Sequence, residues 1–233
     1  MKKFLYLAVP VVLFFFLVST SEASPGGVAL AQFSGESELG QQLENSDRDI
    51  LAETILLPED SFDTVEAAEM IRRIAKLPQP LLNRIDEEGI RVRLFEGNLT
   101  DNPTASHLKG KTPRGYTNGA TWDSVPGIGG AEIVLVKIGA SEKGKGHGSI
   151  NLELHELAHS IDHLVYKDFS DQDSFQAIWK KERTELFPGR DYFIIYPEEY
   201  FAEAFAYYYF SAESNAFLKS TAPLTYELIK GLD

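Results

Sequence analysis

The chain has 233 residues, enough for one domain or at most two small ones. Hydrophobic residues make up 43% of the sequence and aromatic residues 12%, which suffices for a packed core and excludes a largely disordered chain. The 35 acidic residues outnumber the 22 basic ones, so the formal net charge is −13, the wrong sign for a nucleic-acid partner. The absence of cysteine excludes disulfides, thiolate metal sites and a cysteine nucleophile.

The first residues have the pattern of an export signal. Two lysines precede an apolar run over residues 4–18, and small residues at 21 and 23 suit cleavage after Ala23. A membrane-spanning helix needs about 20 apolar residues, so this run is too short to form one. We therefore expect a signal peptide over residues 1–23, a secreted, extracellular protein and no stable membrane anchor. Residues 24–45, rich in Gly, Ser, Gln and Glu, predict a flexible leader before a domain over 46–233.

The first part of that domain is expected to combine helices with a strand. Asp63–Glu66 has the spacing of a capping box, and apolar residues continue after it at helical period. A second, shorter helix over residues 81–88 is expected to end at Gly89. Apolar and polar residues alternate over 90–94, which predicts a half-buried strand.

The middle of the chain is expected to be a long loop followed by a second strand. Residues 97–130 are rich in Gly, Pro, Asn and Thr, which favours loop structure. The apolar run over 133–138 predicts the strand, and the chain is expected to be helical from Asn151 onward. Strands early and helices late predict an α+β domain.

The helical half contains the pattern His-Glu-x-x-His at residues 155–159. Residues four apart lie one turn apart on the same face of a helix, so His155 and His159 can bind one metal ion. Glu156 lies beside them, where its carboxylate can take a proton from water. One catalytic Zn²⁺ fits best, because the chain offers imidazole and carboxylate ligands but no thiolates. The alternative is a helix with two merely hydrogen-bonded histidines.

The third ligand is expected to come from a later helix that begins with Pro197. His163, one further turn along, lies too far from His155 to share its ion, and we interpret it as structural. Glu199 and Glu203 are one turn apart, so one can hold the metal while the other orients a ligand histidine, and spacing only slightly favours Glu199 as ligand. A solvated acidic stripe is the alternative, but the residues between the two acids are apolar or aromatic.

Several separated segments resemble a known family. Residues 121–127, 144–156 and 192–206 are similar to the secreted Pro-Pro endopeptidases, zinc proteases related to the catalytic domain of anthrax lethal factor. The resemblance implies a zincin-like single domain, in which a small mixed sheet and a long loop precede a mainly helical C-terminal half. That half carries the His-Glu-x-x-His helix and the downstream glutamate helix.

The resemblance also implies roles for single residues. His155, His159 and Glu199 would be the zinc ligands, and Glu156 would be the general base. Tyr192 would donate its phenol proton toward the oxyanion that develops during the reaction.

On the substrate side, the resemblance implies that Glu198 pairs with Arg114. Tyr116 stands where the family commonly has Trp, against the kinked proline substrate, so the preferred flanking residues can differ. Trp122 is either a stacking surface or part of the core. His147 is either a substrate-side group or a solvated residue of the loop 141–148, which we expect to flank the cleft and to shift on substrate binding.

These observations predict a monomeric, secreted zinc endopeptidase that hydrolyses Pro-Pro bonds in proline-rich peptides or cell-surface proteins. A proline nitrogen has no N–H, so apolar contacts must do more of the recognition, while the strand over 133–138 can pair with extended parts of the substrate. One alternative is a lethal-factor-like protease without strict proline preference. Another is a catalytically silent surface-binding module that keeps zinc for folding, although Glu156 favours an enzyme because purely structural sites need no base.

Overall fold

The computed structural model describes residues 26–115 and 119–232. The expected signal peptide over 1–23 and the substrate residue Tyr116 lie outside the described residues. Within those ranges, no helix combines the length and the apolar character that crossing a membrane requires.

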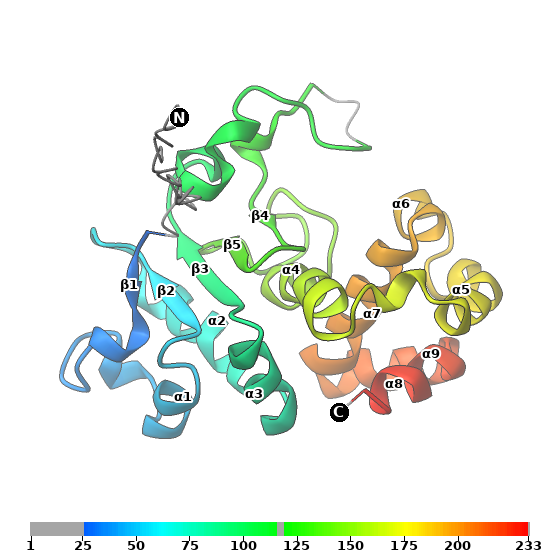
Figure 1. The fold of residues 1–233 in the computed structure, drawn as a ribbon, viewed down its shortest axis with the longest axis horizontal. Helices are drawn as coiled ribbons and strands as arrows, with labels where there is room; N and C mark the ends of the chain where they lie inside the picture. The colour runs from blue at the N-terminus through cyan, green and yellow to red at the C-terminus, as the bar shows by residue number, and fades with distance from the viewer. Residues whose placement is uncertain (1–25, 116–118, 233) are drawn as a thin grey trace, which may run out of the picture.

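The first half of the described chain contains a mixed sheet (Figure 1). Its five strands follow the order β1-β2-β3-β5-β4, in which β2, β3 and β5 are parallel and the outer strands β1 and β4 are antiparallel to their neighbours. In the middle of the sheet, Val92 pairs with Ile55 on one side and Val134 on the other. The strands are β1 (Val28–Ala29), β2 (Ile55–Leu57), β3 (Arg91–Phe95), β4 (Gly127–Ile128) and β5 (Ile133–Lys137).

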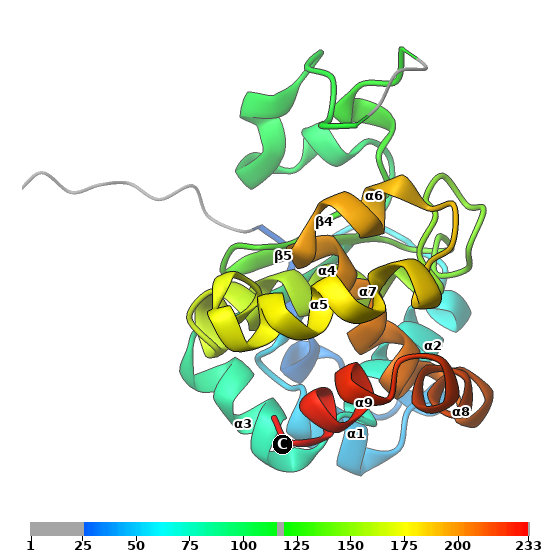
Figure 2. The same cartoon turned by 90° about the vertical axis from the view of Figure 1, so that its right-hand side faces the viewer.

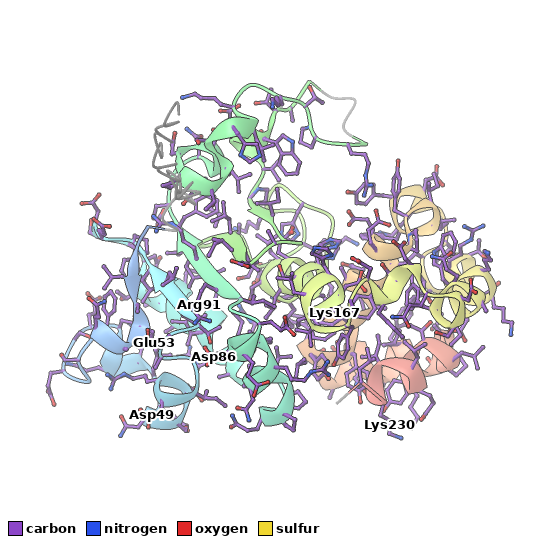
Figure 3. All side chains as sticks on the ribbon, in the orientation of Figure 1. Asp49, Glu53, Asp86, Arg91, Lys167 and Lys230 are labelled. Carbon is purple, nitrogen blue, oxygen red and sulfur yellow. The ribbon has the colours of Figure 1, made fainter. Side chains whose placement is uncertain are left out.

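Two ends of the helices in this half lie at the expected signals, the start of α2 and the end of α3. The helices are α1 (Asn45–Ile50), α2 (Thr64–Ala75) and α3 (Gln79–Glu87). The Asp63 carboxylate accepts hydrogen bonds from the backbone of Val65 and Glu66, which caps α2. Gly89 follows α3 with a φ of +71°, a conformation that glycine adopts without strain. Two residues later, Arg91 pairs with Asp86 at 3.1 Å and joins β3 to α3 (Figure 3).

Residues 26–45 are folded onto the domain, which corrects the expected flexible leader and the domain start at 46. β1 pairs with β2 as the outer strand of the sheet, and two short 3-10 turns follow it. Leu30 and Leu39 are each 1% exposed and Leu43 is 8% exposed, all in the main hydrophobic core. The leucines are few among polar residues, so composition alone concealed that each one is buried.

The second half of the chain is helical, as expected, and it packs on the sheet through its first helix (Figures 1 and 2). Aromatic residues fill the space between these helices, where Phe187 contacts Tyr200 and Phe175 contacts Phe201. Together with the sheet this confirms the α+β fold class. The helices are α4 (Leu152–Ser160), α5 (Asp173–Leu186), α6 (Asp191–Ile195), α7 (Pro197–Phe210), α8 (Ala212–Thr221) and α9 (Pro223–Lys230).

The long segment between β3 and β4 forms a separate small lobe, drawn in green at the top of Figure 1. It contains short 3-10 turns over 99–101, 103–108 and 122–124 rather than a featureless loop. Asp123 joins the ends of this lobe, because its carboxylate accepts hydrogen bonds from Thr100, Gly110 and Thr121 at 2.6 to 2.8 Å. These bonds, led by that from Thr100, lower the pKa of Asp123 to about 2.

Candidate active site

Helix α4 positions the His-Glu-x-x-His pattern. Asn151 caps the helix, since its side-chain oxygen accepts the backbone N–H of Leu154 at 3.0 Å. Leucines on the other side of the helix, Leu154 and Leu157 among them, are fully buried in the main core. The expected helix over 151–166 is therefore present, although its last part, Ile161–Val165, is a π-helix.

Three side chains from α4 and α7 converge on one point. His155 Nε2 lies 3.3 Å from His159 Nε2 and 3.3 Å from Glu199 Oε2. Glu199 Oε2 lies 3.4 Å from His159 Nε2, so the three donor atoms form a nearly equilateral triangle. Among the described residues, this is the group of histidine and acidic side chains that can hold a metal ion.

The triangle has the dimensions that zinc requires. In a tetrahedral site with bonds of about 2.05 Å, neighbouring ligand atoms lie about 3.3 Å apart. Two imidazole nitrogens and one carboxylate oxygen are also the donor set that zinc takes in hydrolytic enzymes, with a fourth position left open. The residues present therefore fit zinc in both geometry and chemistry.

The carboxylate of Glu203 holds the ring of His155 from behind. Glu203 Oε2 lies 3.1 Å from His155 Nδ1, and Oε1 accepts the backbone N–H of Ile150 at 3.0 Å. Glu203 is fully buried, so these contacts meet the need of a buried charge for partners. The bond at Nδ1 leaves Nε2 of His155 facing the donor triangle.

Glu199 uses its two oxygens for different neighbours. Oε2 faces the histidines, whereas Oε1 accepts the phenol hydrogen of Tyr192 at 2.6 Å. Burial alone would raise the pKa of Glu199, but the bonds to His155 and His159 outweigh it and hold this pKa far below its usual range. Burial and the nearby Glu199 charge raise the pKa of Tyr192 strongly, which keeps the phenol protonated.

Glu156 lies on the same side of α4 as the histidines, close against β4. A Cβ at Gly129 would lie 1.9 Å from the Glu156 carbonyl oxygen, and one at Gly127 would lie 2.8 Å from Glu156 Cγ, so only glycine allows this approach. Burial, and secondarily the charge of Glu199, raise the pKa of the Glu156 carboxyl against the opposing effect of the two histidines. A raised pKa suits a group that must accept and then return a proton.

Arg114 connects the small lobe to the start of α7. Its guanidinium donates to Glu198 at 2.7 Å, lies 3.5 Å from Glu199 Oε1 and stacks over the ring of Tyr196 at 4.0 Å from the centroid. The residue that follows Gly115, Tyr116, is outside the described residues.

A cleft of about 1000 Å³ opens over these groups, between the small lobe and the helical half. Trp122 lines it and also packs on the cluster around Phe95 and Leu99, so the ring lies at the border between cleft and core. His147 lines the cleft as well, but its Nε2 donates to the carbonyl of Ala140 at 2.7 Å, and burial lowers its pKa. His163 contacts Asp168 and also lines the cleft, but it is not part of the donor triangle.

The edge of the sheet that borders the cleft is β4, which corrects the expected role of the strand over 133–138. That strand, β5, lies between β3 and β4, and its residues Leu135 and Val136 are already paired with β4. β4 is two residues long, too short for an alternating pattern in the sequence. The glycine-rich run Gly127–Gly130 was the available sequence signal for β4, because glycines in a strand mark a close approach of another backbone or a ligand.

Arg190 and Tyr196 are further residues at the site that the sequence pattern did not reveal. Arg190 precedes α6, lines the cleft and donates to Glu203 at 3.3 Å. Neither residue stands at a motif spacing, so their places depend on how α6 packs against α7.

Comparisons with known proteins agree with this site. A family model described as the anthrax toxin lethal factor N- and C-terminal domain matches residues 42–232. The chain is 43% identical to the Pro-Pro endopeptidase of Clostridioides difficile (strain 630) over 186 residues, which cover 79% of this chain and 84% of that protein. It is 41% identical to the Pro-Pro endopeptidase of Paenibacillus alvei over 187 residues, covering 80% and 86% of the two chains.

The fold is similar as well. The solved structure of the Pro-Pro endopeptidase from Paenibacillus alvei matches with a TM-score of 0.75 and 42% identity, covering 79% of this chain and 100% of that one. The resemblance drawn from the separated sequence segments is thereby confirmed. The chain belongs to the family of the anthrax lethal factor domain and the Pro-Pro endopeptidases, and it is a metalloendopeptidase of that type.

Proposed function

We propose that this chain is a secreted zinc endopeptidase that hydrolyses the bond between two prolines in proline-rich peptides or cell-surface proteins. The observation that carries the proposal is the donor triangle of His155, His159 and Glu199, with Glu156 beside it under an open cleft. The relatives named Pro-Pro endopeptidase, 41% and 43% identical over most of the chain, support the choice of substrate.

The proposed ligands are His155, His159 and Glu199, with Glu203 orienting His155. When bound there, zinc supplies Lewis-acid chemistry that polarises the scissile carbonyl and lowers the pKa of water to about 7. Glu156 takes the proton of the attacking water and later returns it to the leaving proline nitrogen.

Tyr192 is the proposed donor to the negative charge that develops on the carbonyl oxygen. Its phenol holds its proton because its pKa is raised, and its hydroxyl lies 2.6 Å from Glu199, at the margin of the donor triangle. In this structure the phenol hydrogen is donated to Glu199 Oε1, so the hydroxyl must turn from that carboxylate to the carbonyl oxygen, where a hydrogen bond to developing charge contributes strongly to rate.

Recognition of a Pro-Pro bond must work without the amide hydrogen that ordinary peptides offer. Apolar side chains that line the cleft, such as Trp122 and Val125, suit proline rings. We propose that the substrate is also contacted by residues around these apolar side chains, namely Arg114, Tyr116, Glu198 and His147. Extended residues away from the scissile bond would pair with the edge strand β4 rather than with the internal β5.

The test uses a peptide library with a central Pro-Pro, Pro-Ala or Ala-Pro pair, with products identified by mass spectrometry. The zinc-loaded protein is expected to cut between the two prolines and to leave the other two sets intact. Cleavage independent of proline would favour a lethal-factor-like protease without proline preference. The absence of any cleavage by a zinc-loaded protein would favour a binding module and would contradict the proposal.

Glu156→Gln is the matched control, because it removes the base and leaves all three ligands. It is expected to keep one zinc per chain while cleavage slows by at least about a hundredfold. A Glu156→Gln protein that cuts at the normal rate would refute the assigned mechanism. Export is tested separately, by the N-terminal sequence of the protein in the culture medium, which is expected to begin at Ser24.

A further inference from the structure

Arg190 makes contacts on two sides of the candidate site. One guanidinium nitrogen, NH1, donates to Glu203 Oε1 at 3.3 Å, and the other, NH2, donates to the carbonyl oxygen of Gly148. Gly148 belongs to the segment between β5 and α4, which lies beside α6 in Figure 2. Arg190 therefore joins a loop of the cleft to a carboxylate that holds His155.

The contacts on Glu203 fix both ends of a short connection. Glu203 Oε1 receives the Arg190 guanidinium and the backbone N–H of Ile150, two residues after Gly148. The segment from Gly148 to Ile150 is thus held at both ends. Arg190 bonds to Gly148 at one end, and Glu203 bonds to Ile150 at the other. Ile150 is followed directly by Asn151, the cap of α4.

Ring contacts keep the guanidinium in this position. The guanidinium carbon of Arg190 lies over the ring of Phe193, 4.1 Å from its centroid, within the range of a cation–π contact. The same ring meets His155 edge-on, with the centroids 6.1 Å apart. The side chain of Arg190 is 25% exposed, so its charge is partly shielded from water and its bonds are stronger than those of a surface pair.

We propose that Arg190 is a positioning residue that fastens the loop 141–149 against the metal-site helix. It does so as a fork, with one arm on Glu203 and the other on the Gly148 carbonyl. The loop lines the cleft through His147, Gly148 and Ser149. The two hydrogen bonds of Arg190 therefore fix the position of the cleft wall on that side. The consequence for peptide cleavage rests on the proposed function, whereas the loop contact itself does not.

Arginine is needed because the two acceptors lie on different sides of the side chain. A planar guanidinium presents donors in several fixed directions, whereas a lysine ammonium is a compact charge on a flexible stem. Lysine at this position can approach Glu203 but is not expected to hold the Gly148 carbonyl as well. The substitution Arg190→Lys therefore separates the effect of the positive charge from the effect of hydrogen bonding to both acceptors.

The experiment measures amide hydrogen exchange of residues 144–149, KM and kcat on a Pro-Pro peptide, and zinc content. Arg190→Ala is expected to speed exchange in this segment by about tenfold and to raise KM by about fivefold to tenfold, with kcat within about threefold. Zinc content should stay at the wild-type level, because the three ligands and the contact from Glu203 to His155 remain. Arg190→Lys is not expected to recover the protection of the loop.

Arg183→Ala is the matched control. Arg183 also donates to α6, at the carbonyl of Ile194 at 2.8 Å, and also stacks on an aromatic ring, that of Trp179, but Glu203 and Gly148 are not among its recorded partners. Its loss should loosen α6 without changing exchange in 144–149. Equal loop exchange in Arg183→Ala and Arg190→Ala would overturn the proposal, as would wild-type exchange in Arg190→Ala or full loop protection in Arg190→Lys.

The readouts separate this proposal from the proposed function. If the wild-type protein fails to cut Pro-Pro peptides, the proposed function fails, but the exchange experiment still decides whether Arg190 fastens the loop. If cleavage is normal in every variant while loop exchange is faster in Arg190→Ala and Arg190→Lys but not in Arg183→Ala, Arg190 fastens the loop without affecting substrate binding, which refutes the KM part of the proposal.

Discussion

The two oxygens of Glu199 face different groups, and this division distinguishes Glu199 from Glu203. Both acids stand one turn apart on α7, so sequence spacing alone could not decide which one completes the metal site. In the structure Glu199 Oε2 completes the triangle with the two histidines, whereas Glu203 reaches the far nitrogen of His155. The histidine pair was predictable because helical period fixes it, but the third member of the triangle depends on how α7 packs against α4.

Tyr192→Phe tests the proposed oxyanion donor at the residue scale. Removing the hydroxyl is expected to lower kcat by about a hundredfold with little change in KM, because the bond is proposed to form in the transition state. Since the pKa of Tyr192 is raised, its phenol keeps its proton at all pH values below 10, and no loss of rate between pH 7 and 10 should come from this residue. The measurement is kcat and KM against pH on a Pro-Pro peptide.

Tyr196→Phe is the control for that substitution, since Tyr196 is near in sequence and its ring, not its hydroxyl, holds Arg114. Its activity is expected to stay within about twofold of the wild type. A Tyr192→Phe protein with full kcat, or one whose loss lies wholly in KM, would show that Tyr192 only binds substrate.

At the scale of elements, the small lobe between β3 and β4 depends on one carboxylate. Asp123 accepts hydrogen bonds from Thr100, Gly110 and Thr121, and its pKa is lowered from the usual 3.8 to about 2. A lowered pKa means that the folded lobe favours the charged form, so this stabilisation is complete above about pH 4 and is lost as the pH falls toward 2. Trp122, the next residue back along the chain, reports the change by fluorescence.

We therefore expect the lobe to loosen between pH 4 and pH 2 in wild-type protein. The measurement is the emission of Trp122 in a Trp179→Phe background, compared with the far-ultraviolet circular dichroism of the helices. Asp123→Asn should show the loosened emission already at pH 7, because the amide lacks the charge and one acceptor. If the Asp123→Asn protein retains the wild-type acid transition, that transition arises from the titration of another carboxyl group.

The elements differ in how well the sequence predicts them. The caps at Asp63 and Asn151 and the turn at Gly89 are local signals, and the helices they bound were predicted closely. The strand at 133–138 was also predicted, but its place inside the sheet was not, because β4 beside it is too short to leave a pattern. Periodicity reveals which residues are extended or helical, whereas strand order comes from pairing between distant segments.

At the scale of the whole molecule, the boundary of the domain was the least predictable feature. Residues 26–45 have a composition typical of a linker, yet they supply an outer strand and three leucines to the main core. Composition averages over a segment, while burial is decided residue by residue by what the rest of the fold leaves uncovered. The family match from residue 42 onward does not include most of this segment.

Two shortened chains test whether the segment belongs to the fold. A chain starting at Ser24, the expected mature protein, is the reference, whereas one starting at Ser46 loses β1 together with Leu30, Leu39 and Leu43. At roughly 1.5–3 kcal/mol per buried leucine, the shorter chain is expected to melt at least about 10 °C lower. Leu39→Ala in the longer chain separates the packing contribution from the strand, and calorimetry measures all three. Equal melting temperatures for the two shortened chains would show that residues 26–45 are a linker and do not stabilise the fold.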